Sequence, residues 1–98
     1  MTKVVNLRKE KYDIYIGREN RRYKLKRSIW SNPFKIGMDG TREEVIEKYR
    51  RHITEMMYYN PDLRIDLLKL KGKILGCWCK PKACHGDIII ELLRELEE

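Results

Sequence analysis

The sequence is organised around one stretch, Gly76-Cys77-Trp78-Cys79-Lys80-Pro81-Lys82-Ala83-Cys84-His85-Gly86-Asp87. This stretch contains all three cysteines, one of the two histidines and one of the two tryptophans. An apolar run over residues 73–78 leads into it, and a run with helical periodicity begins at Ile88. The pattern predicts a strand, a tight loop and the start of a helix, which is a common way to build a binding site.

The other elements follow from periodicity and from capping signals. Residues 74–78 are apolar on both faces, which indicates a buried central strand. Two short strands are predicted over residues 3–8 and 12–17, and the short polar segment between them favours an antiparallel hairpin. Helices are predicted over residues 41–58, behind a capping box of Thr41 and Glu44, over residues 60–72, with Asn60 and Pro61 at the start and Gly72 at the end, and over residues 88–96. This order predicts an α/β fold: a single small domain over residues 1–98, in which three to four helices cover a short mixed sheet of about three to four strands.

Charge is abundant and unevenly distributed. Charged residues make up 38% of the chain, and the net charge is +7. Residues 1–51 carry fifteen Lys or Arg against seven Asp or Glu, whereas residues 52–98 carry seven against eight. A positive N-terminal half attracts nucleic acid, nucleotides or acidic proteins, although the same charge also serves solubility.

Residues 18–27 hold six basic residues and one acid, so we expect an exposed basic loop there. It is either a solvated insertion or an arm that contacts phosphates, with Tyr23 available to stack on a base. The side chains of the second interpretation are Arg21, Arg22, Lys24, Lys26 and Arg27.

The cysteine count is odd, and no N-terminal apolar segment resembles a signal peptide. We therefore expect a cytoplasmic protein with reduced thiols and no membrane contact.

Three kinds of chemistry fit the central stretch. Cys77, Cys79, Cys84 and His85 supply four zinc ligands, although their spacing differs from that of common zinc modules. The loop before the last helix can instead bind an anion, with His85 and Asp87 orienting it or performing acid–base work, unless the Asp87 carboxylate caps the helix. A thiol nucleophile is the third interpretation, with Cys84 beside His85 at a helix start, or Cys79 paired with His85.

Further motifs extend this pattern along the chain: Val5-Asn6-Leu7-Arg8, Tyr15-Ile16-Gly17-Arg18, Ser28-Ile29-Trp30-Ser31-Asn32-Pro33-Phe34 and Asp39-Gly40-Thr41-Arg42-Glu43-Glu44-Val45. With the central stretch, they resemble the uncharacterised family catalogued as domain of unknown function 4326, met in prokaryotes and their viruses. The resemblance covers nearly the whole chain and implies a compact α/β domain, without an activity or a cofactor. The family usually has a shorter segment between the Gly-Arg and Trp-x-Asn-Pro-Phe motifs, so residues 18–27 resemble, in part, an insertion.

The leading functional prediction is a domain that binds a nucleotide or a related phosphorylated ligand at the strand-loop-helix site of residues 77–87. The residues predicted to bind it are Asn6, Arg8, Arg18, Trp30, Asn32, Trp78, Cys79, Cys84 and Gly86, and those with a catalytic role, if there is one, are His85 and Asp87. The alternatives are a nucleic-acid-binding module that uses the basic N-terminal half and a zinc-stabilised interaction domain. The sequence leaves open whether the site is catalytic.

Overall fold

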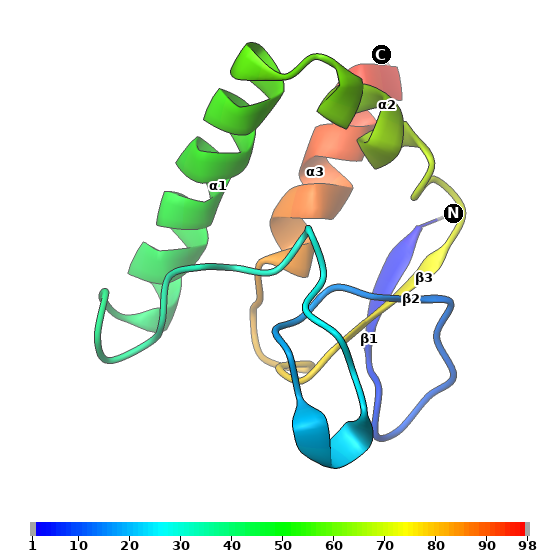
Figure 1. Ribbon diagram of the computed structural model, residues 1–98, viewed down its shortest axis with the longest axis vertical. Coiled ribbons are helices and arrows are strands. Elements are labelled where there is room, and N and C mark those ends of the chain that lie inside the picture. Colours follow the sequence, from blue (N-terminus) through cyan, green and yellow to red (C-terminus); the bar gives the residue numbers. More distant parts are fainter. Residues whose placement is uncertain (1, 98) are drawn as a thin grey trace.

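The computed structural model describes residues 2–97, which fold in the order strand, strand, short 3-10 turn, two helices, strand and helix. These elements are β1 (Lys3–Asn6), β2 (Ile14–Tyr15), η1 (Arg21–Tyr23), α1 (Arg42–Tyr59), α2 (Asp62–Leu68), β3 (Ile74–Cys77) and α3 (Gly86–Glu97). Figure 1 shows the strands gathered at one side of the molecule and the three α-helices at the other. The predicted α/β class, with three strands and three α-helices, is confirmed.

The sheet has the order β1-β3-β2, and β3 runs parallel to both neighbours. The predicted antiparallel hairpin between the first two strands is therefore wrong, and the described strands form a parallel sheet where a mixed one was expected. Residues 7–10 turn over the end of β1, where the Asn6 carbonyl accepts the N–H groups of Lys9 and Glu10. The chain then returns to β3, since the Asp13 carboxylate accepts the Ile74 N–H at 2.8 Å. Strand β3 lies between β1 and β2, and its residues are the most deeply buried of the sheet, as is usual for a central strand.

Helix α1 begins at the predicted capping box, which is confirmed: the Thr41 hydroxyl accepts the Glu44 N–H, and the Glu44 carboxylate accepts the Thr41 N–H. The stripe of Val45, Tyr49 and Ile53 is buried, because a spacing of four residues places all three on one face of the helix. Helix α2 is shorter than predicted, because it starts at Asp62 and is followed by turns up to Gly72, whose φ is +79°.

Helix α3 links the helical layer to the sheet. It lies against β1, and both α1 and α2 pack on it. Its apolar face, Ile88, Ile89, Leu92 and Leu93, is buried in the same core as Leu75 of β3. None of the helices described over residues 2–97 is both long enough and apolar enough to span a membrane.

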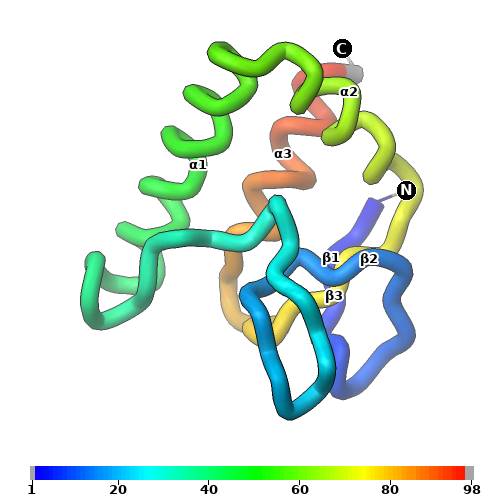
Figure 2. The backbone as a smooth tube through the Cα atoms, in the orientation of Figure 1, coloured from blue at the N-terminus to red at the C-terminus, as the bar shows by residue number. Residues whose placement is uncertain are grey.

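A long irregular segment, residues 16–41, joins β2 to α1. Figure 2 shows it descending through the basic loop around η1, returning along the strands and then crossing to the start of α1. This path places residues 32–38 beside the first turns of α1 and near the end of β3, which sets up the site described next.

Candidate functional site

A pocket of about 570 Å³ lies where β2 and β3 end and α1 begins. Because the strands are parallel, their carboxyl ends meet at one edge of the sheet, which is where open α/β sheets bind ligands. The pocket is lined by Tyr15, Gly17, Arg18, Glu19, Asn20, Asn32, Phe34, Lys35, Ile36, Met38, Arg42, Val45, Ile46, Cys77, Trp78, Cys79, Ala83, Cys84 and His85. Of the predicted ligand-binding residues, it brings together Arg18, Asn32, Trp78, Cys79 and Cys84.

Arg18 and Asn32 border the pocket and also build its wall. The Arg18 guanidinium donates hydrogen bonds to the carbonyls of Asn32, at 2.9 Å, and of Phe34, at 2.8 Å. The Asn32 amide nitrogen donates to the Val45 carbonyl at 3.1 Å, and its oxygen accepts the Phe34 N–H at 2.9 Å. Together they fasten the segment that carries Phe34 between the end of β2 and α1.

Trp78 is held as the aromatic wall at the end of β3. Its indole N–H donates to the Tyr15 hydroxyl at 2.8 Å, and that hydroxyl donates to the Arg18 carbonyl at 2.6 Å. The Tyr23 ring centroid lies 5.0 Å from that of Trp78, and the Arg8 guanidinium lies 5.0 Å from the centre of the Trp78 ring. Arg8 therefore contacts Trp78 and does not border the pocket.

Trp30 and Asn6, both predicted to bind the ligand, lie outside the pocket. Trp30 is only 4% exposed and packs in the core. The Asn6 amide donates to the carbonyls of Lys80, at 2.8 Å, and of Trp78, at 3.4 Å, so it fixes the loop after β3.

Gly86, also predicted at the site, has a packing role. A Cβ atom on this residue would lie 2.8 Å from the Val4 side chain and 2.9 Å from that of Ile16. Real Cβ atoms do not approach that closely, so the missing side chain lets the first turn of α3 settle on the strands.

Cys77 and Cys84 form the most distinctive pair in the pocket. Their sulfur atoms lie 3.6 Å apart, and the Cys84 thiol donates to the Cys77 sulfur. This hydrogen bond, the backbone N–H groups of Lys80 and Cys79 and the Lys80 charge lower the pKa of Cys77 against the opposing effect of burial. The same pairing, together with burial, raises the pKa of Cys84. The low-pKa thiol is therefore Cys77, not Cys84 as the sequence suggested.

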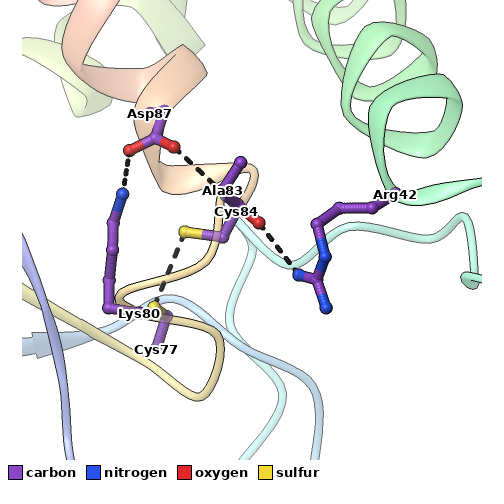
Figure 3. Close-up of polar contacts among 6 residues, drawn as sticks. All are labelled: Arg42, Cys77, Lys80, Ala83, Cys84 and Asp87. Atoms are coloured by element: carbon purple, nitrogen blue, oxygen red, sulfur yellow. Dashed lines mark hydrogen bonds and ion pairs between the residues drawn. The ribbon is translucent and has the colours of Figure 1, made fainter.

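Asp87 caps the loop in front of α3 (Figure 3). Its carboxylate accepts the Cys84 N–H at 3.1 Å and forms an ion pair with the Lys80 ammonium, while the Asp87 N–H donates to the Cys84 carbonyl at 3.0 Å. Figure 3 also shows Arg42 reaching from α1 to the Ala83 carbonyl, at 2.9 Å. Asp87 does not border the pocket, and its carboxylate accepts the N–H of Cys84, which precedes α3, where the capping interpretation expected an N–H group of the helix itself.

His85 lines the pocket, and its Nε2 atom lies 2.7 Å from the Ile16 carbonyl oxygen. A carbonyl only accepts, so Nε2 carries the proton. Burial lowers the pKa of His85, and the nearby Arg18 charge lowers it further. The ring also packs edge-on against Tyr49, with 5.0 Å between centroids. A neutral imidazole results, and the predicted catalytic pair of His85 and Asp87 does not face a common space.

The four predicted zinc ligands, Cys77, Cys79, Cys84 and His85, do not converge. Among residues 2–97, no three His, Cys, Asp or Glu side chains are arranged to hold a metal ion. Only the sulfur atoms of Cys77 and Cys84 meet, and the His85 Nε2 atom is engaged with a carbonyl.

The basic residues of the loop lie at the surface around η1. All five predicted to contact nucleic acid, Arg21, Arg22, Lys24, Lys26 and Arg27, are exposed. Arg21 pairs with Glu19 at 2.9 Å, and Arg27 donates to the Ser31 hydroxyl at 3.2 Å. The loop is ordered by the Asn20 side chain, which accepts the Tyr23 N–H at the start of η1.

Tyr15, Lys35, Met38 and Arg42 are among the pocket residues that the sequence interpretation did not assign to the site. Tyr15 could have been found, because alternation along β2 sends it to the opposite side from Ile14 and Ile16. Arg42 gives no local signal, since a basic residue in the first turn of a helix is common at any surface.

Comparisons with known proteins agree with this picture of an uncharacterised domain. The family model described as domain of unknown function (DUF4326) matches residues 2–95. An uncharacterized protein of Acanthamoeba polyphaga mimivirus is 36% identical over 96 residues, covering 88% of this chain and 70% of that protein. An uncharacterized 12.4 kDa protein in the nrdA-td intergenic region of Enterobacteria phage T4 is 34% identical over 97 residues, covering 98% of this chain and 81% of that protein. No solved structure matches significantly.

Proposed function

This chain belongs to the family described as domain of unknown function (DUF4326), which brings no activity with it, and we propose from its pocket that it binds a nucleotide or a related phosphorylated compound. The observation that carries this proposal is the mixture of side chains around one cavity. Tyr15, Phe34 and Trp78 supply aromatic surface, and Arg18, Lys35 and Arg42 supply positive charge. A ligand with an aromatic base and an anionic group would contact the aromatic side chains with its base and the positively charged ones with its anionic group.

The size and place of the pocket support the proposal. Its volume of about 570 Å³ lies within the range of roughly 300–1,000 Å³ that is usual for small-molecule sites. It opens at the carboxyl edge of the sheet, where the loops after parallel strands are free to shape a site.

Arg42 is the cation to test, because it projects from the first turn of α1 toward the loop of residues 83–85 (Figure 3). Isothermal titration calorimetry with nucleoside monophosphates, diphosphates and triphosphates, each paired with its parent nucleoside, measures the contribution of phosphate. We expect the nucleotides to bind more tightly than the nucleosides. Arg42→Gln should weaken nucleotide binding roughly tenfold or more, the usual effect of losing a hydrogen bond to a charged group.

Arg51→Gln is the matched control, since Arg51 is an exposed arginine on the same helix that does not border the pocket. Thermal melting of both variants separates lost binding from lost folding. Failure of every nucleotide to bind the folded protein, or an equal loss in the two variants, would refute the proposal.

A second candidate function, contact with single-stranded nucleic acid, is favoured by the loop around η1. Tyr23 is 49% exposed, and its ring contacts that of Trp78 at a tilt of 58° among five exposed basic side chains. An exposed aromatic ring within positive charge is the usual platform for a stacked base and its phosphate.

Fluorescence anisotropy with a labelled oligonucleotide tests this second candidate. Affinity should fall steeply with added salt, and a variant with Arg21, Arg22, Lys24 and Lys26 changed to Gln should lose it. A control variant with Arg64, Lys69, Lys73 and Arg94 changed to Gln removes the same charge elsewhere and should bind as the parent does. Binding that ignores salt, or that the control loses equally, would exclude the loop as the contact surface.

A further inference from the structure

Two of the thiols that line the pocket are in direct contact with each other. Cys77 ends β3 and Cys84 precedes α3, and their sulfur atoms lie 3.6 Å apart. Both residues line the pocket, although they are only 1% and 2% exposed. The third thiol, Cys79, also lines the pocket and is half-buried, but it has no such partner among the described residues.

The two thiols differ in their surroundings. The Cys77 sulfur accepts hydrogen bonds from the Cys84 thiol and from the backbone N–H groups of Cys79 and Lys80, with the Lys80 ammonium nearby. These donors stabilise a thiolate at Cys77. The Cys84 sulfur accepts one backbone N–H, from Gly86, but its contact with Cys77, its burial and the nearby Asp87 carboxylate raise its pKa, so Cys77 is the more readily ionised of the two. One sulfur is thus prepared as a nucleophile, and the other is a thiol in contact with it.

We propose that Cys77 and Cys84 form a redox couple that a small hydroperoxide oxidises to an intramolecular disulfide. The Cys77 thiolate attacks one oxygen of hydrogen peroxide, the O–O bond breaks, and hydroxide leaves, giving a sulfenic acid at Cys77. The Cys84 sulfur then attacks the Cys77 sulfur. The S–O bond breaks, the Cys84 proton leaves with the hydroxyl as water, and the S–S bond forms. Overall, two thiols lose two electrons and two protons, and one hydrogen peroxide becomes two water molecules.

The geometry selects both the oxidant and the resolving thiol. Both cysteines line the pocket and are almost fully buried, so a small oxidant is favoured over a bulky disulfide. Closing the S–S bond to its length of about 2.05 Å brings the two sulfurs together from 3.6 Å, which side-chain rotation can supply. Neither step needs a bound nucleotide, so this inference stands independently of the ligand proposed above.

Mass spectrometry of the full chain tests the couple directly. After treatment with stoichiometric hydrogen peroxide, the intact mass should fall by two hydrogens, and peptide mapping should find the disulfide between Cys77 and Cys84. The reductant dithiothreitol should reverse it. Cys84→Ser should instead accumulate a sulfenic acid at Cys77 that dimedone captures.

Cys79→Ser is the matched control, because it removes the third thiol without removing either partner, and it should still form the disulfide between Cys77 and Cys84. The wild-type measurement needs no variant to fold. A protein that stays reduced, a disulfide that includes Cys79, or oxidation of Cys77 to sulfinic acid without a disulfide would each overturn the proposal.

Discussion

The Tyr49 hydroxyl donates a hydrogen bond of 2.7 Å to the main-chain carbonyl of Trp30, and both residues are buried. This contact joins the middle of α1 to the irregular segment that carries the pocket wall. Asn32, two residues further along that segment, makes a parallel connection to the Val45 carbonyl on the same helix. The segment that carries the pocket wall is therefore hydrogen-bonded to α1 at two positions, Val45 and Tyr49.

Tyr49→Phe should destabilise the protein by about 1–3 kcal/mol, because the Trp30 carbonyl would remain buried without its donor. Urea denaturation measures the free energy of unfolding. Tyr58→Phe is the matched control, since Tyr58 is 79% exposed and loses no buried partner. Equal effects of the two substitutions would contradict a structural role for the buried hydroxyl.

Asn6→Asp should destabilise the loop after β3. The substitution keeps the oxygen that accepts the Arg8 N–H, but it turns the two donors that hold the Lys80 and Trp78 carbonyls into an acceptor. We expect a loss of about 1–3 kcal/mol in the free energy of unfolding. Hydrogen exchange should also quicken over residues 78–84.

The exposed Asn60→Asp variant controls for the added charge and should stay within about 0.5 kcal/mol of the parent. If Asn6→Asp were equally harmless, the Asn6 amide would not be what fixes the loop.

Gly86→Ala should cost about 1–3 kcal/mol, as expected for overpacking in a core. The new methyl group would overlap with the side chains of Val4 and Ile16. In a Val4→Ala background the same change should cost less, because the space is vacated. The four free energies of unfolding form a double-mutant cycle, and strict additivity would show that the crowding at Val4 is not responsible.

The stability of the protein should decrease as the pH falls through the ordinary titration range of histidine. Burial lowers the pKa of His85 in the folded state, so below about pH 6.5 the unfolded chain binds this proton more readily than the folded protein does. The stabilisation is complete above that pH and is lost as the pH falls toward the lower folded pKa.

Denaturation at several pH values checks this prediction. His85→Gln keeps a donor for the Ile16 carbonyl and removes the titration, so its stability should vary less with pH in this range. If the decline persisted in His85→Gln and vanished in His52→Gln, the titrating group would be the other histidine.

The sequence was sufficient where short-range chemistry decides the structure. The Thr41 and Glu44 capping box predicted the start of α1, and the two-sided apolar pattern of residues 74–78 predicted a central strand. Strand pairing was predicted wrongly, because a parallel partner 61 or 71 residues away leaves no local mark. A short polar segment between two strands has the same composition whether the two strands pair with each other or each of them pairs with a third strand.

The site was predicted in part for the same reason. The central stretch borders the pocket, to which it contributes Cys77, Trp78, Cys79, Ala83, Cys84 and His85. Which thiol has the lowered pKa depends on the direction of individual N–H groups and on Lys80, and these directions are fixed only by the folded loop. Sequence alone gives no reason to prefer Trp30 or Trp78 as a ligand-binding residue. In the structure, Trp30 is buried in the core, whereas Trp78 borders the pocket.

The position of β3 in the sheet determines when the protein can assemble. Both β1 and β2 pair with residues 74–77 of β3, and these two early strands do not pair with each other. During synthesis on a ribosome, the first seventy residues would emerge with α1 and α2 able to form but with both early strands unpaired. Such dependence on distant contacts slows folding. The sheet, the core and the pocket should then appear together, once β3 and α3 have left the exit tunnel.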